Sequence, residues 1–304
     1  MRRADLLPDI IYHYTSLEVL QALLANIREI NGERCFVFHA SKINCMNDPS
    51  EFLHGYKILW KTLERMEANG TERRYKLTSI WDNIGKNQEE CEKMLIDNIY
   101  EKDQAPYVIC FSKQKDSLPL WNMYAAYASG VNLGFISDKV TLEFDEESHV
   151  KDVNVEHFLP VIDVEYSTLA FDMHENLIRN MYDNYMKEIV ATAPTEMLKV
   201  KVNHLSLMSL ATAPYIKTPA YHFEDEARLY HYLTQDEKVL HKFTPAGTCK
   251  PYIQIPIPVR SLSSVTLGPC CNQAALTELL RRELDELALS PVQLYSSSIA
   301  YRNI

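Results

Sequence analysis

Two glutamates and an arginine alternate in a segment whose pattern predicts an extended chain. Glu224, Glu226 and Arg228 lie two positions apart, and residues at this spacing point to the same face of a strand. Two carboxylates beside a guanidinium can orient a sugar hydroxyl or stabilise a developing oxocarbenium ion. A surface salt bridge on an edge strand explains the same spacing equally well.

A histidine lies between two tyrosines at the end of a predicted strand. The run Tyr12-His13-Tyr14-Thr15 is followed at once by leucines at helical spacing. This pattern places an imidazole beside the free amides of a helix N-terminus, which suits a ribose hydroxyl or an anion. A strand histidine bonded to a backbone carbonyl is the plainer interpretation, and the residues alone favour it.

Three aromatic residues recur at helical spacing in the middle of the chain. Trp121, Tyr124 and Tyr127 fall on roughly one helix face. Such a face could stack a nicotinamide or adenine ring, although aromatic stripes more often belong to a core. We expect Tyr127 to be a core residue, and the pattern leaves the roles of Trp121 and Tyr124 open.

A helix start with one unexplained residue follows the second predicted strand. In the run Asn47-Asp48-Pro49-Ser50-Glu51, Asp48 fits a helix cap and Pro49 the first helical position. Capping does not explain Asn47. We therefore expect Asn47 to contact an anion or a nucleotide near the helix amides.

Strand and helix patterns alternate along the chain and position these residues. A run over 10–15 predicts a strand, and the helix over 17–27 that follows is expected to be capped by Thr15 with Glu18. A helix opening at 117–119 is expected to end at Gly130. Further strands are predicted at 35–40, 107–111, 131–136, 161–166, 227–233, 252–257, 265–267 and 292–296, and a further helix at 273–287.

The predicted strands outnumber the helices that could cross over between them. This favours an α+β fold with a mixed, largely antiparallel sheet and flanking helices. Residues 1–304 are expected to form a single domain with helical insertions at about 61–104 and 169–212. The helices of the second insertion could pair with a second subunit.

Composition excludes several function classes. With 31 basic and 41 acidic residues the chain carries a net charge of −10, which opposes a surface that binds duplex nucleic acid throughout. A local basic patch such as Arg73-Arg74 stays open. The 8 glycines form no phosphate-binding loop, which disfavours Rossmann and P-loop folds. No H-E-x-x-H or G-x-S-x-G occurs, so we expect neither a metal site nor a serine hydrolase.

Cysteine usage and hydropathy indicate a cytoplasmic protein. The 7 cysteines include no C-x-x-C, so we predict neither a disulfide framework nor a zinc knuckle. The beginning of the chain has no apolar stretch long enough for a signal peptide. No apolar run approaches the length of a membrane helix, and we expect no membrane partner.

The chain resembles a widespread bacterial family of uncharacterised function over positions 10 to 136 and 215 to 270. The shared features are Tyr12-His13-Tyr14, Asn47-Asp48-Pro49-Ser50-Glu51, Cys110-Phe111-Ser112, Trp121-x-x-Tyr124-Ala125 with Gly130-Val131, Glu224-x-Glu226-x-Arg228 and Val265-Thr266-Leu267-Gly268-Pro269.

A more distant similarity is to ADP-ribosyltransferases of the His-Tyr-Glu class. It implies an ADP-ribosyltransferase-like fold, NAD as the substrate and no metal. It also implies that His13 holds the ribose of NAD and that Glu226 orients the ribose hydroxyl while the nicotinamide bond breaks, with Glu224 competing for that role. The residues that would contact NAD are His13, Tyr14, Thr15, Asn47, Trp121, Tyr124 and Arg228.

Two hypotheses of different classes follow from this resemblance. The first is an NAD-dependent ADP-ribosyltransferase, or an NAD-cleaving effector of a toxin or phage-defence type, whose acceptor is a protein or a nucleic acid. The second is a non-catalytic module that senses a nucleotide or binds a protein on the same fold. A nuclease is disfavoured by the acidic charge.

Overall fold

The chain divides into two compact units. The computed structural model describes residues 7–48, 50–68, 70–83, 88–101, 104–141, 161–166, 175–233, 237–243, 247–289 and 291–301. The first unit comprises Met1–Ser41, Tyr107–Val164 and His222–Ile304, and the second comprises Lys42–Pro106 and Glu165–Tyr221. The helices of the two predicted insertions belong to the second unit, while the single-domain organisation stays a prediction.

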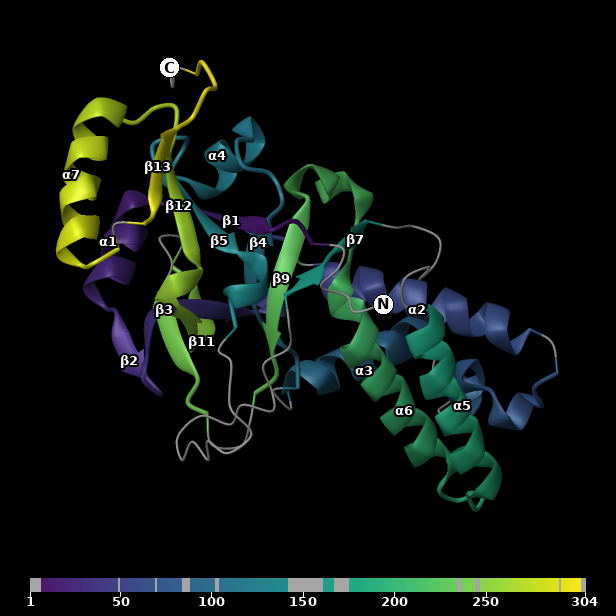
Figure 1. Cartoon of the computed structure of the whole chain (residues 1–304). Coiled ribbons are helices and arrows are strands. Elements are labelled where there is room, and N and C mark those ends of the chain that lie inside the picture. Colours follow the sequence, from purple (N-terminus) through teal and green to yellow (C-terminus); the bar gives the residue numbers. More distant parts are fainter. Residues whose placement is uncertain are drawn as a thin grey trace. The chain divides into compact units, whose positions relative to one another are not determined.

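The first unit is built on one large sheet (Figure 1). Among the strand pairs of this sheet whose residue pairing is described, β12 with β13 is parallel and the others are antiparallel. The predicted mixed, largely antiparallel α+β fold is therefore confirmed. The strands are β1 (Ile10–Thr15), β2 (Arg28–Ile30), β3 (Glu33–Lys42), β4 (Tyr107–Ser112), β5 (Val131–Ile136), β6 (Ile162–Asp163), β9 (Glu226–His231), β10 (Leu240–Phe243), β11 (Cys249–Pro258), β12 (Leu262–Leu267) and β13 (Gln293–Ser296).

Strands β1, β3 and β4 meet at one point of this sheet. Strand β4 pairs with β9 along its whole length but shares with β1 the single registered pair Tyr12↔Ser112. Strand β1 instead pairs with β5 from end to end, and β3 lies next to β4. Strands β1 and β4 therefore separate directly after Tyr12, at the position of His13.

Helices cover both faces of the first unit's sheet. Helices α1 (Leu17–Ala25) and α7 (Gln273–Glu286) contribute leucines to the main core, which includes Phe36 and Phe135. Figure 1 shows these two helices on the same side of the sheet. Helix α4 (Leu118–Tyr124) contributes to a second, smaller cluster with residues of β1.

Two predicted helix boundaries in the first unit are wrong. Thr15 stays paired with Val131 in the sheet, so Ser16 caps α1 and accepts from the amide of Val19. Helix α4 ends at Tyr124 rather than near Gly130, because residues 126–128 all have positive φ. The expected core position of Tyr127 is also wrong, since its side chain is 73% exposed.

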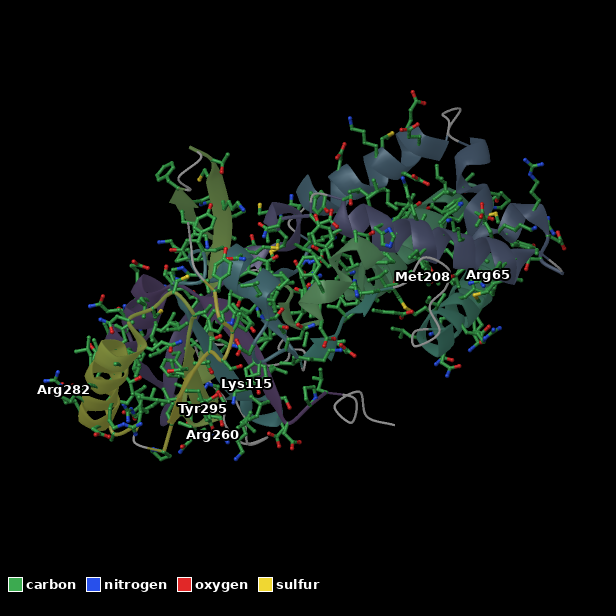
Figure 2. All side chains as sticks on the ribbon, turned by 90° about the horizontal axis from the view of Figure 1, so that it is seen from above. Arg65, Lys115, Met208, Arg260, Arg282 and Tyr295 are labelled. Atoms are coloured by element: carbon green, nitrogen blue, oxygen red, sulfur yellow. The ribbon has the colours of Figure 1, made fainter. Side chains whose placement is uncertain are left out.

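The second unit is mainly helical. Strands β7 (Glu165–Tyr166) and β8 (Ile216–Lys217) pair in parallel. Its core includes Leu59, Tyr185 and Met208, the last of which is labelled in Figure 2. The helices are α2 (Glu51–Glu67), α3 (Gln88–Glu101), α5 (Glu175–Ala191) and α6 (Met197–Thr212).

The start of α2 differs from the predicted cap. The cap position is Ser50, whose amide and hydroxyl both donate to Asp48 Oδ1, at 2.9 and 2.7 Å. Asp48 therefore fixes the turn before the helix instead of capping it. Pro49, expected at the first helical position, lies outside the described residues.

Gly55 allows α2 to pack closely against the segment Ala213–Tyr215, which follows α6. A Cβ atom at position 55 would lie 2.3 Å from the carbonyl oxygen of Ala213. We expect Gly55→Ala to lower the free energy of unfolding by about 1–3 kcal/mol through overpacking. Urea denaturation measures this change. Lys57→Ala on the exposed face of the same helix should change stability by at most about 0.5 kcal/mol, and equal effects of both variants would contradict the close crossing.

Candidate functional site

His13 lies where β1 and β4 separate. Its Nδ1 is 2.9 Å from the carbonyl oxygen of Cys110, so Nδ1 carries the proton and Nε2 is left as an acceptor. Its ring makes edge contacts with Phe38 and Phe111 at centroid distances of 5.3 and 5.9 Å. The side chain is partly exposed. The carbonyl bond matches the plainer interpretation of this histidine and also fixes its tautomer.

Acid is expected to destabilise the protein through His13. Desolvation lowers the pKa of His13 below its ordinary value of 6.5, and the bond to Cys110 offsets this only in part. The folded state therefore binds fewer protons than the unfolded state as pH falls below about 6.5, and stability declines until the lowered pKa is passed. Urea denaturation at about pH 7.5, 6.5 and 5.5 should show a smaller decline for His13→Gln than for wild type. Equal declines would contradict this.

Glu226 and Arg228 form a buried ion pair. Arg228 Nε donates to Glu226 Oε1 at 2.6 Å and Nη2 donates to Oε2 at 2.7 Å. The residues are only 3% and 0% exposed. Strand β9 has β4 on one side and β6 on the other. This pair is thus neither at the surface nor on an edge strand, and both oxygens of Glu226 are engaged.

The strand register places the side chains of His13 and Glu226 on opposite faces of the sheet. Ala227 pairs with Phe111, and both belong to the main core against which His13 packs. Glu226, paired with Ser112, points to the opposite face because neighbours in a strand alternate. The described contacts of His13 are with β3 and β4 rather than with this carboxylate.

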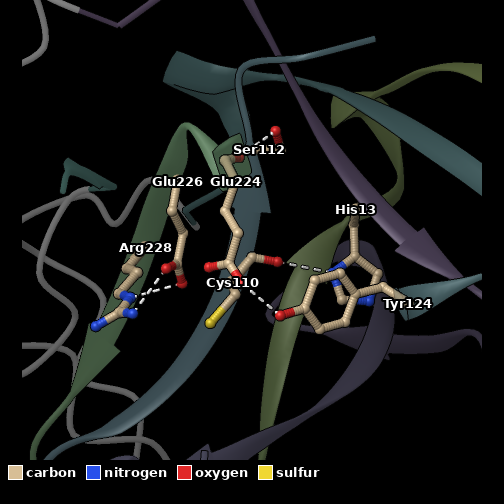
Figure 3. Close-up of polar contacts among 7 residues, drawn as sticks. All are labelled: His13, Cys110, Ser112, Tyr124, Glu224, Glu226 and Arg228. Atoms are coloured by element: carbon tan, nitrogen blue, oxygen red, sulfur yellow. Dashed lines mark hydrogen bonds and ion pairs between the residues drawn. The ribbon is translucent and has the colours of Figure 1, made fainter. Parts of the chain in front are cut away.

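Glu224 is held by Tyr124. The Tyr124 hydroxyl donates to Glu224 Oε1 at 2.6 Å, and the Ser112 hydroxyl donates to the Glu224 carbonyl at 2.6 Å. Glu224 is 4% exposed. It precedes β9 in a short 3-10 helix, and Asp225 has a φ of 43°, so Glu224 does not share the extended segment that the alternation predicted. Figure 3 shows the Tyr124 contact beside the Glu226–Arg228 pair.

Burial distinguishes the two aromatic candidates. Trp121 is 0% exposed, and its ring packs at 78° on Tyr14 with centroids 4.9 Å apart. The Tyr14 hydroxyl donates to the Gln114 carbonyl and accepts from the Ser117 amide. No ring surface of Trp121 is left for a ligand. Tyr124 keeps partial exposure and is therefore the aromatic residue that could contact one.

Thr15 and Asn47 belong to different units of the chain. Thr15 is buried in β1 and is not the cap of α1. Asn47 belongs to the second unit, where its side chain is exposed.

Sequence reasoning missed Asp116, which holds the loop before α4. Asp116 accepts from Trp121 Nε1 at 2.6 Å, from the Ser297 hydroxyl at 2.7 Å and from the Ser298 amide at 2.9 Å. Burial raises its pKa, but these bonds outweigh burial and leave the pKa below its ordinary value. Figure 2 marks Lys115 near Tyr295, with Nζ 3.7 Å from the ring centroid. Ser297 and Ser298 lie 181 and 182 positions from Asp116 in the sequence, and no local pattern signals them.

The described residues hold no group of three or more histidine, cysteine, aspartate or glutamate side chains placed to bind a metal ion. Within the same part of the chain, the helices are too short or too polar to span a membrane. The candidate residues therefore offer the Tyr124 phenol and the buried carboxylates of Glu224 and Glu226. The His13 imidazole contacts Phe38, Cys110 and Phe111 instead.

A family model described as a protein of unknown function, DUF2971, matches residues 120–229. This segment runs from α4 to β9 and includes Tyr124, Glu224, Glu226 and Arg228, but not His13. The match fits the expected resemblance to an uncharacterised family. Neither the curated proteins nor the solved structures gave a match.

Proposed function

We propose that the first unit binds NAD and breaks the bond between nicotinamide and ribose. The observation that carries this proposal is the 2.6 Å hydrogen bond from the Tyr124 hydroxyl to the buried Glu224 carboxylate. It joins a partly exposed aromatic ring to a carboxylate, and no metal is needed. A carboxylate can stabilise the positive charge of a dissociative glycosyl transfer, and an aromatic ring can stack the nicotinamide.

Glu224 is the carboxylate that we assign to this reaction. When the bond from ribose C1′ to the nicotinamide nitrogen breaks, its electron pair leaves with neutral nicotinamide and positive charge develops on the ribose. A carboxylate beside the ribose stabilises that charge. Arg228 pairs with both oxygens of Glu226 and compensates its charge, whereas the donor to Glu224 Oε1 is the neutral Tyr124 hydroxyl. This difference favours Glu224 over Glu226. An acceptor hydroxyl, amine or water then bonds to C1′ and loses a proton.

His13 is assigned to the ribose. With Nδ1 bonded to the Cys110 carbonyl and the pKa lowered by desolvation, the ring is neutral near pH 7. Its Nε2 can then accept a hydrogen bond from a ribose hydroxyl, which an imidazolium could not do. The partial exposure of His13 supports access from outside the core.

Nicotinamide release by the purified chain tests the function. We expect release from NAD, and His13→Ala should slow it by about 10-fold to 100-fold if a hydroxyl bond is lost. Adding bacterial lysate with NAD labelled in its adenylate part shows whether label enters protein or nucleic acid. If NAD stays intact in every tube, with and without lysate, the proposal that the chain cleaves NAD is overturned.

A second candidate is a module that binds a nucleotide without cleaving it. It is favoured by one observation, that at least three of the four carboxylate oxygens of Glu224 and Glu226 already have partners inside the unit. Calorimetric titration with NAD distinguishes the two, because this candidate predicts heat of binding with no nicotinamide formed.

On the first proposal, the chain acts in the bacterial cytoplasm as a toxin-like or phage-defence effector.

A further inference from the structure

Most of β3 and all of β10 and β11 lack carboxylates. Residues 34–41 of β3 and all of β10 and β11 contain no aspartate or glutamate, whereas the whole chain has 41. The basic residues of these segments are Arg34, His39, His241, Lys242 and Lys250. The charge of this part of the sheet is thus opposite to that of the chain.

The register places several of these residues on one outer face. Lys242 pairs with Lys250, and two positions further along β11 Tyr252 pairs with Ser41 of β3. Gln254 pairs with His39. The alternate residues Ile253 and Ile255 belong to the main core. We call the side away from this core the basic sheet face; its residues are His39, Lys242, Lys250, Tyr252 and Gln254.

Aromatic rings accompany the lysines. The rings of His39 and Tyr252 lie 4.2 Å apart and are tilted by 34°, and Lys242 Nζ is 5.6 Å from the Tyr252 centroid. His39 and Gln254 are exposed, and Tyr252 is partly so. Like charges directly opposite each other on two strands are unfavourable. A phosphate bound beside Lys242 would offset this repulsion.

Desolvation and the charge of Lys250 lower the pKa of Lys242. Desolvation and the charge of Lys242 likewise lower the pKa of His39. Desolvation is the larger cause in both cases, and the neighbouring positive charge adds to it.

We infer that the basic sheet face binds single-stranded nucleic acid. Unpaired bases stack on aromatic side chains while lysines contact the phosphates, and this face supplies both along neighbouring strands. A free phosphate would use the lysines but not the rings, and a duplex hides the faces of its bases. The inference is independent of NAD cleavage, because binding is measured without NAD.

Protection of a sheet edge explains only part of the basic sheet face. Lysines on an edge strand discourage pairing with another chain, and β10 is the last strand on its side of the described sheet order. This accounts for Lys242. It does not account for the adjacent rings of His39 and Tyr252, which lie on β3 and β11, inside that edge.

Fluorescence anisotropy with a labelled oligothymidylate tests the inference on the full chain. Affinity should fall with salt, and Lys242→Glu with Lys250→Glu should reduce the slope of log affinity against log salt by about 1.4, or 0.7 per lost phosphate contact. Tyr252→Ala should weaken binding by roughly 5-fold to 100-fold, whereas Tyr252→Phe should keep most of it.

The matched control is Lys57→Glu with Lys61→Glu on α2, two exposed lysines of the second unit. This variant changes the net charge by the same amount and should bind like wild type. No binding by wild type, or equal weakening by the control, would overturn the inference. The inference would also be overturned if the Lys242→Glu, Lys250→Glu variant kept its affinity for the oligothymidylate and only began to self-associate. That result would mean that these lysines protect the sheet edge.

Discussion

Replacing Arg228 by methionine is expected to destabilise the first unit by about 3–5 kcal/mol. Arg228 is 0% exposed and gives two hydrogen bonds to Glu226, which is itself 3% exposed. Methionine fills part of the space but leaves a buried carboxylate without its cation. Removing one partner of a buried pair costs far more than the pair itself contributes. Urea denaturation followed by circular dichroism measures the loss.

The double variant Glu226→Gln with Arg228→Met is the decisive control. It removes the charge that Arg228→Met leaves unpaired, so it should be more stable than that single variant. An exposed pair gives the comparison, since Arg74 and Glu72 are 65% and 64% exposed and Arg74→Met should cost at most about 1 kcal/mol. A double variant no more stable than Arg228→Met would show that charge is not the cause.

The strands were predictable because each consists of a short run of apolar, β-branched or aromatic residues that is visible in the sequence. Strand β4 is a continuous apolar run and β1 a β-branched and aromatic one, and both are found where the sequence places them. The end of α4 was not predictable. The turn that follows it is held by contacts from distant residues, such as the Cys270 amide that donates to the Ala128 carbonyl at 2.9 Å. Gly130 is instead required by close approach, since a Cβ there would lie 2.2 Å from the Thr15 carbonyl oxygen.

The sequence predicted which types of residue form the candidate site, but it did not predict which of them contact one another. The alternation of Glu224, Glu226 and Arg228 correctly indicated a carboxylate beside a guanidinium, yet Asp225 turns the chain and sends Glu224 elsewhere. Its partner Tyr124 is 100 residues away in sequence. Only the folded chain shows that Tyr124, rather than the fully buried Trp121, keeps exposed ring surface.

Replacing Glu224 by glutamine is expected to slow nicotinamide release by about 100-fold to 1,000-fold. Glutamine keeps the size of the side chain and can still accept the Tyr124 hydrogen bond, so the 2.6 Å contact loses charge rather than geometry. NAD affinity should change little, because the carboxylate acts on charge that develops only as the glycosidic bond breaks.

The outcome depends on comparing Glu224→Gln with Glu226→Gln, each measured together with its unfolding free energy. If Glu224 is the carboxylate beside the ribose, Glu224→Gln loses turnover at nearly unchanged stability. Glu226→Gln then loses stability, because its partner Arg228 is fully buried, and keeps turnover in the fraction that remains folded. The reverse pattern would move the catalytic role to Glu226, and Tyr124 would then serve to anchor α4 against the start of β9.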